Sequence, residues 1–295
     1  MAQSHCFVGL KPRGAKSYLY NADKRTKFRQ VIWGDFLTID GEEAGGWLRI
    51  IWAPKDPQKK ATVYIQKEDT VEKRPLEIVF VDVGQGDGCV LISPETGKKE
   101  RITVIDAGIG SNMIRFLNGR FRAYRGFKFD AAILTHPDED HYGGFLEIFQ
   151  DPDIGFNTVY HSGLVERPVS GQFDKIGGID ADGYATELPQ TKEDVQELFP
   201  ESVNNLSYRY PKVMRAAIDN AAIGDIRMLS TAHGDEDDGV TYMPGYAPSD
   251  KRGYAIRVLG PVVEPDGDGN PRLRKLGSYG ETKNGHSVLL RLAYG

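Results

Sequence analysis

The sequence predicts an α/β sandwich preceded by a small all-β domain, and three observations lead to this expectation. Short runs of aromatic and β-branched residues, separated by turn residues, occupy residues 1–72. Longer apolar strands that alternate with helical segments follow from residue 76 onward, which is typical of layered α/β folds. The charge balance also changes sign near residue 75. We therefore expect one domain at residues 1–72 and a second at 76–295.

The first domain is expected to be a small β-barrel. Its predicted strands are Ser17–Tyr20, Arg29–Trp33, Phe36–Ile39, Trp47–Trp52 and Thr62–Ile65. Five short strands in about 60 residues favour a compact barrel. The string is similar to bacterial SH3-like domains, which often carry a Gly-Trp pair like Gly46-Trp47. Any other small β module would satisfy the same pattern.

The second domain is expected to begin with three strands, a helix, a strand and a helix. The predicted segments are Leu76–Val83, Gly88–Ser93, Arg101–Asp106, a helix at 111–118, the strand Ala131–Thr135 and a helix that starts at Tyr142–Phe149. This order fits an α/β sandwich. Residues 162–253 lack a comparable pattern, and we interpret them as an insertion or lid. Strand patterns return at Tyr254–Leu259 and Ser287–Leu292.

The net charge of −5 is unevenly distributed. Residues 1–74 contain 14 Lys and Arg against 9 Asp and Glu, whereas residues 75–295 contain 23 against 33. Such a polarity can orient a protein on an anionic partner. Two domains of different composition would explain it equally well.

Other features of the composition exclude several classes of protein. The only cysteines, Cys6 and Cys89, form neither a disulfide framework nor a zinc-ribbon pattern. No apolar run approaches the ~20 residues that span a bilayer. The first residues lack the apolar stretch of a signal peptide. We therefore expect a cytoplasmic protein that does not associate with a membrane.

Four side chains of the kind that bind metals follow the predicted strand Ala131–Thr135. They are His136, Asp138, Asp140 and His141. In an extended chain His136 and Asp138 point the same way, because side chains alternate with a period of two. Imidazoles and carboxylates are common metal ligands, and two close pairs suit two ions ~3.5–4 Å apart. The alternative is a solvated acidic turn.

The segment from Thr135 to Gly144 resembles the His-x-His-x-Asp-His signature of the metallo-β-lactamase superfamily. It is more similar to the Ser/Thr-His-x-Asp-x-Asp-His-x-Gly-Gly form of the hydrolase domain of ComEC, a DNA-uptake protein. Two further segments resemble motifs of that subfamily in the same order, Phe80–Asp87 and Ile105–Gly108. The resemblance implies a metallo-β-lactamase αββα sandwich and the activity of a metal-dependent hydrolase.

The resemblance also implies roles for individual residues. His136 and Asp138 would bind one metal, and Asp140 and His141 would bind the other. Asp106 would hold a ligand histidine in position, and Asp87 would lie at the rim, so that Asp87, Asp106 and Asp140 are the implied catalytic residues. The cofactors would be two divalent ions, Zn²⁺ or Mn²⁺, with Mg²⁺ as an option because a carboxylate replaces an imidazole at Asp138.

A further ligand is expected near the end of the chain. His286, in the segment Asn284–Leu290, is the candidate, and a loop histidine with no role is the alternative. The family pattern continues beyond the equivalent of Leu290–Gly295 with a metal-bridging carboxylate. We therefore expect an incomplete domain, the N-terminal half plus an insertion. A C-terminal fragment or a protein partner would complete this fold, and the chain alone would have little activity.

A basic and aromatic segment precedes the metal loop and suggests a substrate. Residues 107–129 contain no acid, and their basic residues are Arg115, Arg120, Arg122, Arg125 and Lys128. Phe116, Phe121, Tyr124, Phe127 and Phe129 are interleaved with them. Basic groups can follow phosphates while aromatic faces stack on bases. The alternative is a surface helix whose aromatic side chains pack inward. His161 is a candidate for the same cleft, with a structural role as its alternative.

Three functions remain after these steps. The leading hypothesis is a nuclease or phosphodiesterase that uses a metal-activated water on nucleic acid. The second is a hydrolase of a small ester, lactam or thioester. The third is a non-catalytic fragment that regulates or binds a partner through its SH3-like part. Cleavage of DNA or RNA that requires a metal would separate the first from the other two.

Overall fold

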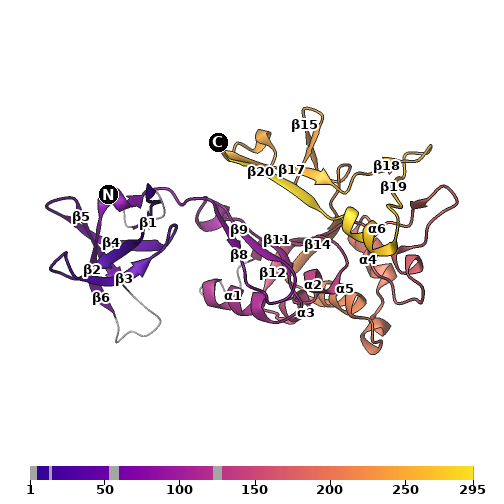
Figure 1. Cartoon of the computed structure of the whole chain (residues 1–295), viewed down its shortest axis with the longest axis horizontal. Helices are drawn as coiled ribbons and strands as arrows, with labels where there is room; N and C mark the ends of the chain where they lie inside the picture. The colour runs from indigo at the N-terminus through magenta and orange to yellow at the C-terminus, as the bar shows by residue number, and fades with distance from the viewer. Residues whose placement is uncertain (1–4, 13–14, 53–59, 122–127, 295) are drawn as a thin grey trace. The chain divides into compact units, whose positions relative to one another are not determined.

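The computed structural model describes residues 5–12, 15–52, 60–121 and 128–294 (Figure 1). The chain divides into two compact units. The first consists of residues 1–78 and 91–101, and the second of residues 79–90 and 102–295. In the described ranges no helix is long and apolar enough to cross a membrane.

The first unit contains a seven-stranded antiparallel sheet with the order β3-β2-β6-β5-β4-β1-β7. Its strands are β1 (His5–Val8), β2 (Ser17–Tyr20), β3 (Lys27–Val31), β4 (Phe36–Glu43), β5 (Trp47–Trp52), β6 (Ala61–Gln66) and β7 (Thr70–Val71). Within the described residues no pairing joins β3 to β7, so this sheet is open where a closed barrel was expected. The likeness to SH3 domains stays a prediction.

The core of this unit follows from the alternation of its strands. In β5, Leu48 and Ile50 are buried, whereas Trp47 and Arg49 are partly exposed. This period of two places one face of each strand in the core. The same core includes Cys6, Leu19 and other apolar side chains. β2 and β5 have the predicted bounds, but β1 and β7 were not predicted.

A six-stranded sheet has the order β14-β12-β11-β10-β9-β8. Its strands are β8 (Glu77–Phe80), β9 (Gly88–Ile92), β10 (Ile102–Ala107), β11 (Lys128–Leu134), β12 (Gly155–His161) and β14 (Ile223–Met228). Within it, β10, β11, β12 and β14 run parallel to one another. Parallel strands are usually covered on both faces, and β11 accordingly buries residues 131–134.

Helices cover one face of this sheet (Figure 1). The helices of the second unit are α1 (Asn112–Phe121), α2 (Glu139–Tyr142), α3 (Phe145–Gln150), α4 (Lys192–Leu198), α5 (Arg209–Asp219) and α6 (Tyr279–Gly285). α3 packs against α5, and α5 packs against β14. Short 3₁₀ turns occur at Lys67–Asp69, Gly97–Lys99, Phe173–Ile176, Glu201–Asn205 and Pro248–Asp250.

Two smaller sheets complete the second unit. β15 (Asp235–Asp237), β16 (Val240–Tyr242), β17 (Tyr254–Gly260) and β20 (Leu289–Tyr294) form one of them, and β13 (Tyr184–Ala185), β19 (Pro271–Arg274) and β18 (Glu264–Pro265) form the other. β17 and β20 lie on the side of the six-stranded sheet opposite α1 and α3 (Figure 1). The hydroxyl of the buried Tyr246 donates to Asp130 Oδ2 of β11 at 2.6 Å. The result is a mixed α/β fold with several sheets.

The segment predicted as an insertion, residues 162–253, contains an edge strand of the main sheet. β14 lies in this segment and pairs in parallel with β12, from Phe156 opposite Ile223 to His161 opposite Met228. Its buried residues, Ile223, Ile226 and Met228, face the interior, while polar residues between them hide the strand pattern in the sequence. This part of the segment therefore belongs to the fold that positions the site.

Candidate metal centre

The four predicted ligands lie at the carboxyl end of β11. The strand ends at Leu134, between β10 and β12, and the chain turns at Asp138 into the short helix α2. Sites in open α/β sheets usually lie at the carboxyl ends of the strands. The turn brings the rings of His136 and His141 to a centroid distance of 4.0 Å.

Asp106, at the end of β10, orients His141. Its Oδ2 lies 2.8 Å from His141 Nδ1 and accepts a 2.7 Å hydrogen bond from the Thr135 hydroxyl, while Oδ1 accepts from the Thr135 amide at 2.9 Å. Asp106 is buried and has a φ of 53°, an uncommon conformation for a residue other than glycine. A carboxylate held in this way fixes the ring and leaves its Nε2 for a ligand.

Opposing effects set the pKa of His141. Burial lowers it, but the carboxylates of Asp106, Asp140 and Asp87 outweigh burial, so that the pKa lies above its ordinary value. Asp87 Oδ2 is 4.0 Å from His141 Nε2, and the Asp87 side chain is 81% exposed. Asp87 is therefore a solvent-exposed carboxylate next to His141.

His136 is buried, and its two ring nitrogens differ. Nδ1 lies 3.1 Å from the Thr135 hydroxyl and 3.2 Å from the Ser287 hydroxyl. Nε2 makes no hydrogen bond, and its distance of 3.5 Å to Asp138 Oδ2 is too long for a good one. An unsatisfied buried polar atom costs about 1–3 kcal/mol, so this nitrogen is suited to receive a cation.

Asp138 is ionised and has partners on both oxygens. His136, followed by Lys283, holds the pKa of this carboxyl well below its usual range, although burial opposes them. Oδ1 forms an ion pair with Lys283 Nζ, and Oδ2 accepts a hydrogen bond of 3.1 Å from Asn284 Nδ2. The sequence did not suggest a role for Lys283 or Asn284, which lie about 145 positions further along the chain.

Glycines allow three loops to approach one another at the site. A Cβ on Gly86, which has a φ of 90°, would lie 1.6 Å from the Asp140 carbonyl oxygen. A Cβ on Gly144 would lie 2.3 Å from the Ala107 carbonyl oxygen. Only glycine fits at such distances. Gly86 and Gly144 therefore allow the loop after β11 to lie directly against its neighbours.

His286 is not brought to the other four residues. It caps the end of α6, and its Nε2 donates to the Arg274 carbonyl oxygen at 2.7 Å. Burial lowers its pKa. Ser287, the next residue, supplies the contact to His136 instead. Among the described residues no recorded contact joins His286 to the loop after β11.

The predicted substrate residues are dispersed. Arg115 and Arg120 are exposed on α1, whereas Arg122 and Arg125 lie outside the described residues. Lys128 begins β11, so a strand of 7 residues separates it from the metal loop, about 20 Å away. His161, at the end of β12, is fully buried.

The environment of His161 favours a structural role. Its Nδ1 accepts a hydrogen bond of 3.1 Å from the Gly163 amide. Burial lowers its pKa to about 3. Of the aromatic residues of the basic segment, Phe121 and Phe129 are buried, and the rings of Phe116 and Phe129 both contact Phe121 edge to face. Tyr124 and Phe127 lie outside the described residues. These observations support the alternatives given for both predictions.

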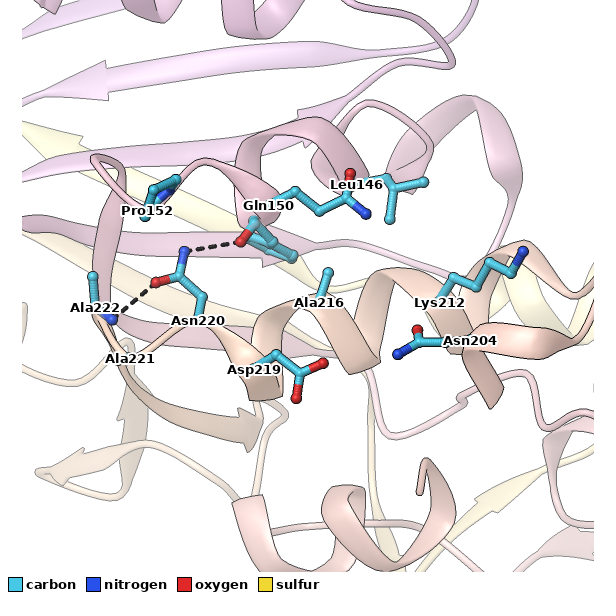
Figure 2. A pocket seen from close by; sticks show the side chains of 11 residues that line it. Leu146, Gln150, Pro152, Asn204, Lys212, Ala216, Asp219, Asn220, Ala221 and Ala222 are labelled. Atoms are coloured by element: carbon cyan, nitrogen blue, oxygen red, sulfur yellow. Dashed lines mark hydrogen bonds between the residues drawn. The ribbon is translucent and has the colours of Figure 1, made fainter. Parts of the chain in front are cut away.

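The site is separate from a hollow of about 720 Å³ that α3 and α5 line (Figure 2). Asn220, directly after α5, donates a hydrogen bond of 2.9 Å to the Phe149 carbonyl oxygen of α3. Asp219 accepts a hydrogen bond of 2.9 Å from Arg215 Nε. The hollow contains none of the predicted ligands, and no role in metal binding follows from it.

The chemistry of the donors at this site fits a divalent ion, but among the described residues their arrangement forms no complete ligand set. Across the described part of the chain, no three His, Cys, Asp or Glu side chains are arranged to hold an ion. The donors come instead in pairs: Nε2 of His141 faces Asp87, and the unsatisfied Nε2 of His136 faces Asp138. Two imidazoles with available Nε2 atoms and nearby carboxylates are a donor set typical of Zn²⁺ and Mn²⁺.

Residues 83–165 match the model of the Metallo-beta-lactamase superfamily. The match contains Asp87, Asp106 and the whole loop after β11. No curated protein matches the chain. Proteins of this superfamily are generally hydrolases that depend on divalent metals, often zinc. The match therefore supports a metal-dependent hydrolase domain in this part of the chain.

Proposed function

We propose that the chain is a divalent-metal-dependent phosphodiesterase that acts on nucleic acid. The observation that carries this proposal is the pair of imidazoles after β11, one oriented by Asp106 and the other with a buried, unsatisfied Nε2. A divalent ion, when bound, lowers the pKa of water and stabilises the charge that develops on an attacked phosphate.

The residues that would hold metal are those of the loop after β11. His136 and His141 would contribute their Nε2 atoms and Asp140 its carboxylate, while Asp138 Oδ2 lies 3.5 Å from His136 Nε2. Asp106 would keep His141 in one orientation through Nδ1. Asp87, which is exposed at the rim, would face the substrate.

The choice of nucleic acid rests on the resemblance of Phe80–Asp87 and Thr135–Gly144 to the ComEC hydrolase domain. Arg115 and Arg120 support it, because both are exposed on α1 and could contact phosphates. Lys128 and His161 do not support it, because one lies at the opposite end of β11 and the other is buried.

The test is a nuclease assay on the full chain with labelled single-stranded and double-stranded DNA and RNA. We expect cleavage with Mn²⁺ or Zn²⁺ and none with EDTA. His141→Ala should lower the rate at least about 100-fold, because it removes a ligand of the activating ion. Cleavage that is unchanged by EDTA and by His141→Ala would refute the proposal.

A second candidate is a hydrolase of a small ester, lactam or thioester. The burial of Phe121 and Phe129 favours it, because these rings are not free to stack on bases. Chromogenic ester and lactam substrates would distinguish the two. Metal-dependent turnover of these compounds without cleavage of nucleic acid would select the second candidate.

A further inference from the structure

Lys283, in the last turn of α6, places a buried ammonium group between two carboxylates. Its side chain is 10% exposed. Nζ forms an ion pair with Asp138 Oδ1, lies 3.0 Å from Glu166 Oε1, and donates to the Pro137 carbonyl oxygen at 3.2 Å. Burial of a charge is costly unless the charge is paired and hydrogen-bonded, and here it has both kinds of partner.

The surroundings hold Lys283 in this position. The Tyr279 hydroxyl donates to Glu166 Oε1 at 2.6 Å, and Lys283 Nζ lies 4.6 Å from the centre of the Tyr279 ring. A capping box at Ser278 fixes the start of α6. After the helix, the Val288 amide donates to the Thr135 carbonyl oxygen at 2.8 Å, which ties this segment to the metal loop.

The partners of Lys283 are atoms that divalent ions also bind. Two carboxylate oxygens and a carbonyl oxygen converge on Nζ, as they do on Mg²⁺, Mn²⁺ or Ca²⁺ in proteins. The second oxygen of Asp138 is already used by Asn284. The chain thus supplies its own cation, the Lys283 ammonium, beside Asp138, where one of the two expected ions would lie.

We propose that the Lys283 ammonium takes the place of a second divalent cation, so that the loop after β11 holds one ion. This inference rests on the proposed function. The single ion lies on the side of the two imidazoles, at the Nε2 atoms of His136 and His141. Asp138 then acts mainly as the counter-ion of Lys283 and as the partner of Asn284.

The experiment counts metal ions per chain after removal of metal with a chelator and reloading with Mn²⁺. Elemental analysis after gel filtration and calorimetric titration both give the stoichiometry. We expect one ion in the wild type. Lys283→Met keeps the apolar stem but removes the charge, and should bind two ions, the second with Asp138, Glu166 and the Pro137 carbonyl oxygen as ligands.

Three further variants serve as controls. Lys283→Arg keeps the charge and should bind one ion. Lys212→Met removes a lysine of α5 that lines the hollow between α3 and α5, which contains none of the predicted ligands, and should also bind one ion (Figure 2). The double variant Lys283→Met, Glu166→Gln loses one positive and one negative charge, and it also loses the Glu166 carboxylate as a ligand. It should again bind one ion. Mn²⁺ should raise the melting temperature of Lys283→Met more than that of the wild type.

Each outcome decides a different question. Two ions in the wild type would overturn the role of Lys283 and leave the proposed function intact. One ion in a folded Lys283→Met chain would also overturn it. A wild type that binds no ion would refute the proposed function and this inference together. If Lys283→Met does not fold, the wild-type count and the Lys283→Met, Glu166→Gln chain still test the inference.

Discussion

His136 and His161 are two histidines at the ends of neighbouring parallel strands, and they have different environments. His136 directly follows β11 and Thr135, whereas His161 ends β12 opposite Leu134. Both are buried, and both have an Nε2 without a hydrogen-bond partner. His136 has Asp138 within 3.5 Å and the ring of His141 beside it, whereas burial alone dominates at His161.

The difference indicates what the proposed metal site would need besides a buried histidine at a strand end. Nearby carboxylates make the difference, because they attract a cation and offset the free-energy cost of removing its bound water. Around His161 burial lowers the pKa to about 3, so that the ring stays neutral and acts as a structural group. Around His136 and His141 three acids are within reach of the imidazoles.

The strongest test of this comparison is substitution of each histidine in turn. His136→Ala should lower Mn²⁺ affinity at least about 100-fold, because it removes a ligand. His161→Ala should leave affinity within about threefold of the wild type but destabilise the chain by about 1–3 kcal/mol, since it empties a buried site. Calorimetric titration and urea unfolding measure the two effects. Equal losses of affinity in both variants would remove the distinction.

Asp106→Asn should lower metal affinity by about 10–100-fold, because an amide orients His141 less firmly than a carboxylate does. Asparagine tolerates the positive φ at this position, so the backbone should remain unchanged. Asp130 of β11 accepts a hydrogen bond from Tyr246, and Asp130→Asn serves as a control for the loss of a carboxylate charge in a strand. Unchanged affinity in Asp106→Asn would show that the carboxylate does not act through His141.

The pH dependence of stability should separate the two histidines in the metal-free chain. The folded pKa of His161 lies near 3, below its unfolded value, so its stabilising contribution is present above pH 6.5 and is lost as the pH falls. Between pH 7 and pH 5 the wild type should lose about 2 kcal/mol more than His161→Gln. Urea unfolding at both pH values measures this, and equal losses would contradict the neutral, buried ring.

His141 should show the opposite sign. Its folded pKa is raised by acids that outweigh burial, so its contribution is present below the unfolded pKa and is lost as the pH rises through the folded value. The histidine ring signals in an NMR titration of the metal-free chain would report this directly. A ring of His141 that titrates below its ordinary pKa would contradict the arrangement with Asp106.

The smallest expected effects concern nucleic acid. Arg115→Ala and Arg120→Ala should each weaken DNA binding a few-fold and lower the slope of log K against log salt by about 1. Lys128→Ala should change neither, because Lys128 lies at the opposite end of β11 from the metal loop. Fluorescence anisotropy at several salt concentrations measures both quantities. A larger effect of Lys128→Ala would move the interface to the other edge of the sheet.

The sequence predicted those parts of the fold that depend on neighbouring residues. The ligand loop was recognisable because its four side chains lie within six positions. The role of Asp106 was implied by the resemblance of Ile105–Gly108 to a family motif, whereas its hydrogen bonds to Thr135 came only from the structure.

The contacts that the sequence did not reveal join distant parts of the chain. Lys283 meets Asp138 and Glu166 across more than a hundred residues, and no local pattern marks a lysine as buried. β14 was hidden because its apolar residues are few and Asp225 and Arg227 interrupt them. His286 was the predicted ligand near the end of the chain, but it caps α6 and its ring donates to the Arg274 carbonyl oxygen.

The most direct test of a metal site after β11 is anomalous X-ray scattering from crystals of the full chain grown with Mn²⁺. The account predicts a peak about 2.0–2.3 Å from the Nε2 atoms of His136 and His141, with Lys283 still paired to Asp138. A peak elsewhere, or density that shows no ion between the two imidazoles in metal-loaded crystals, would contradict it.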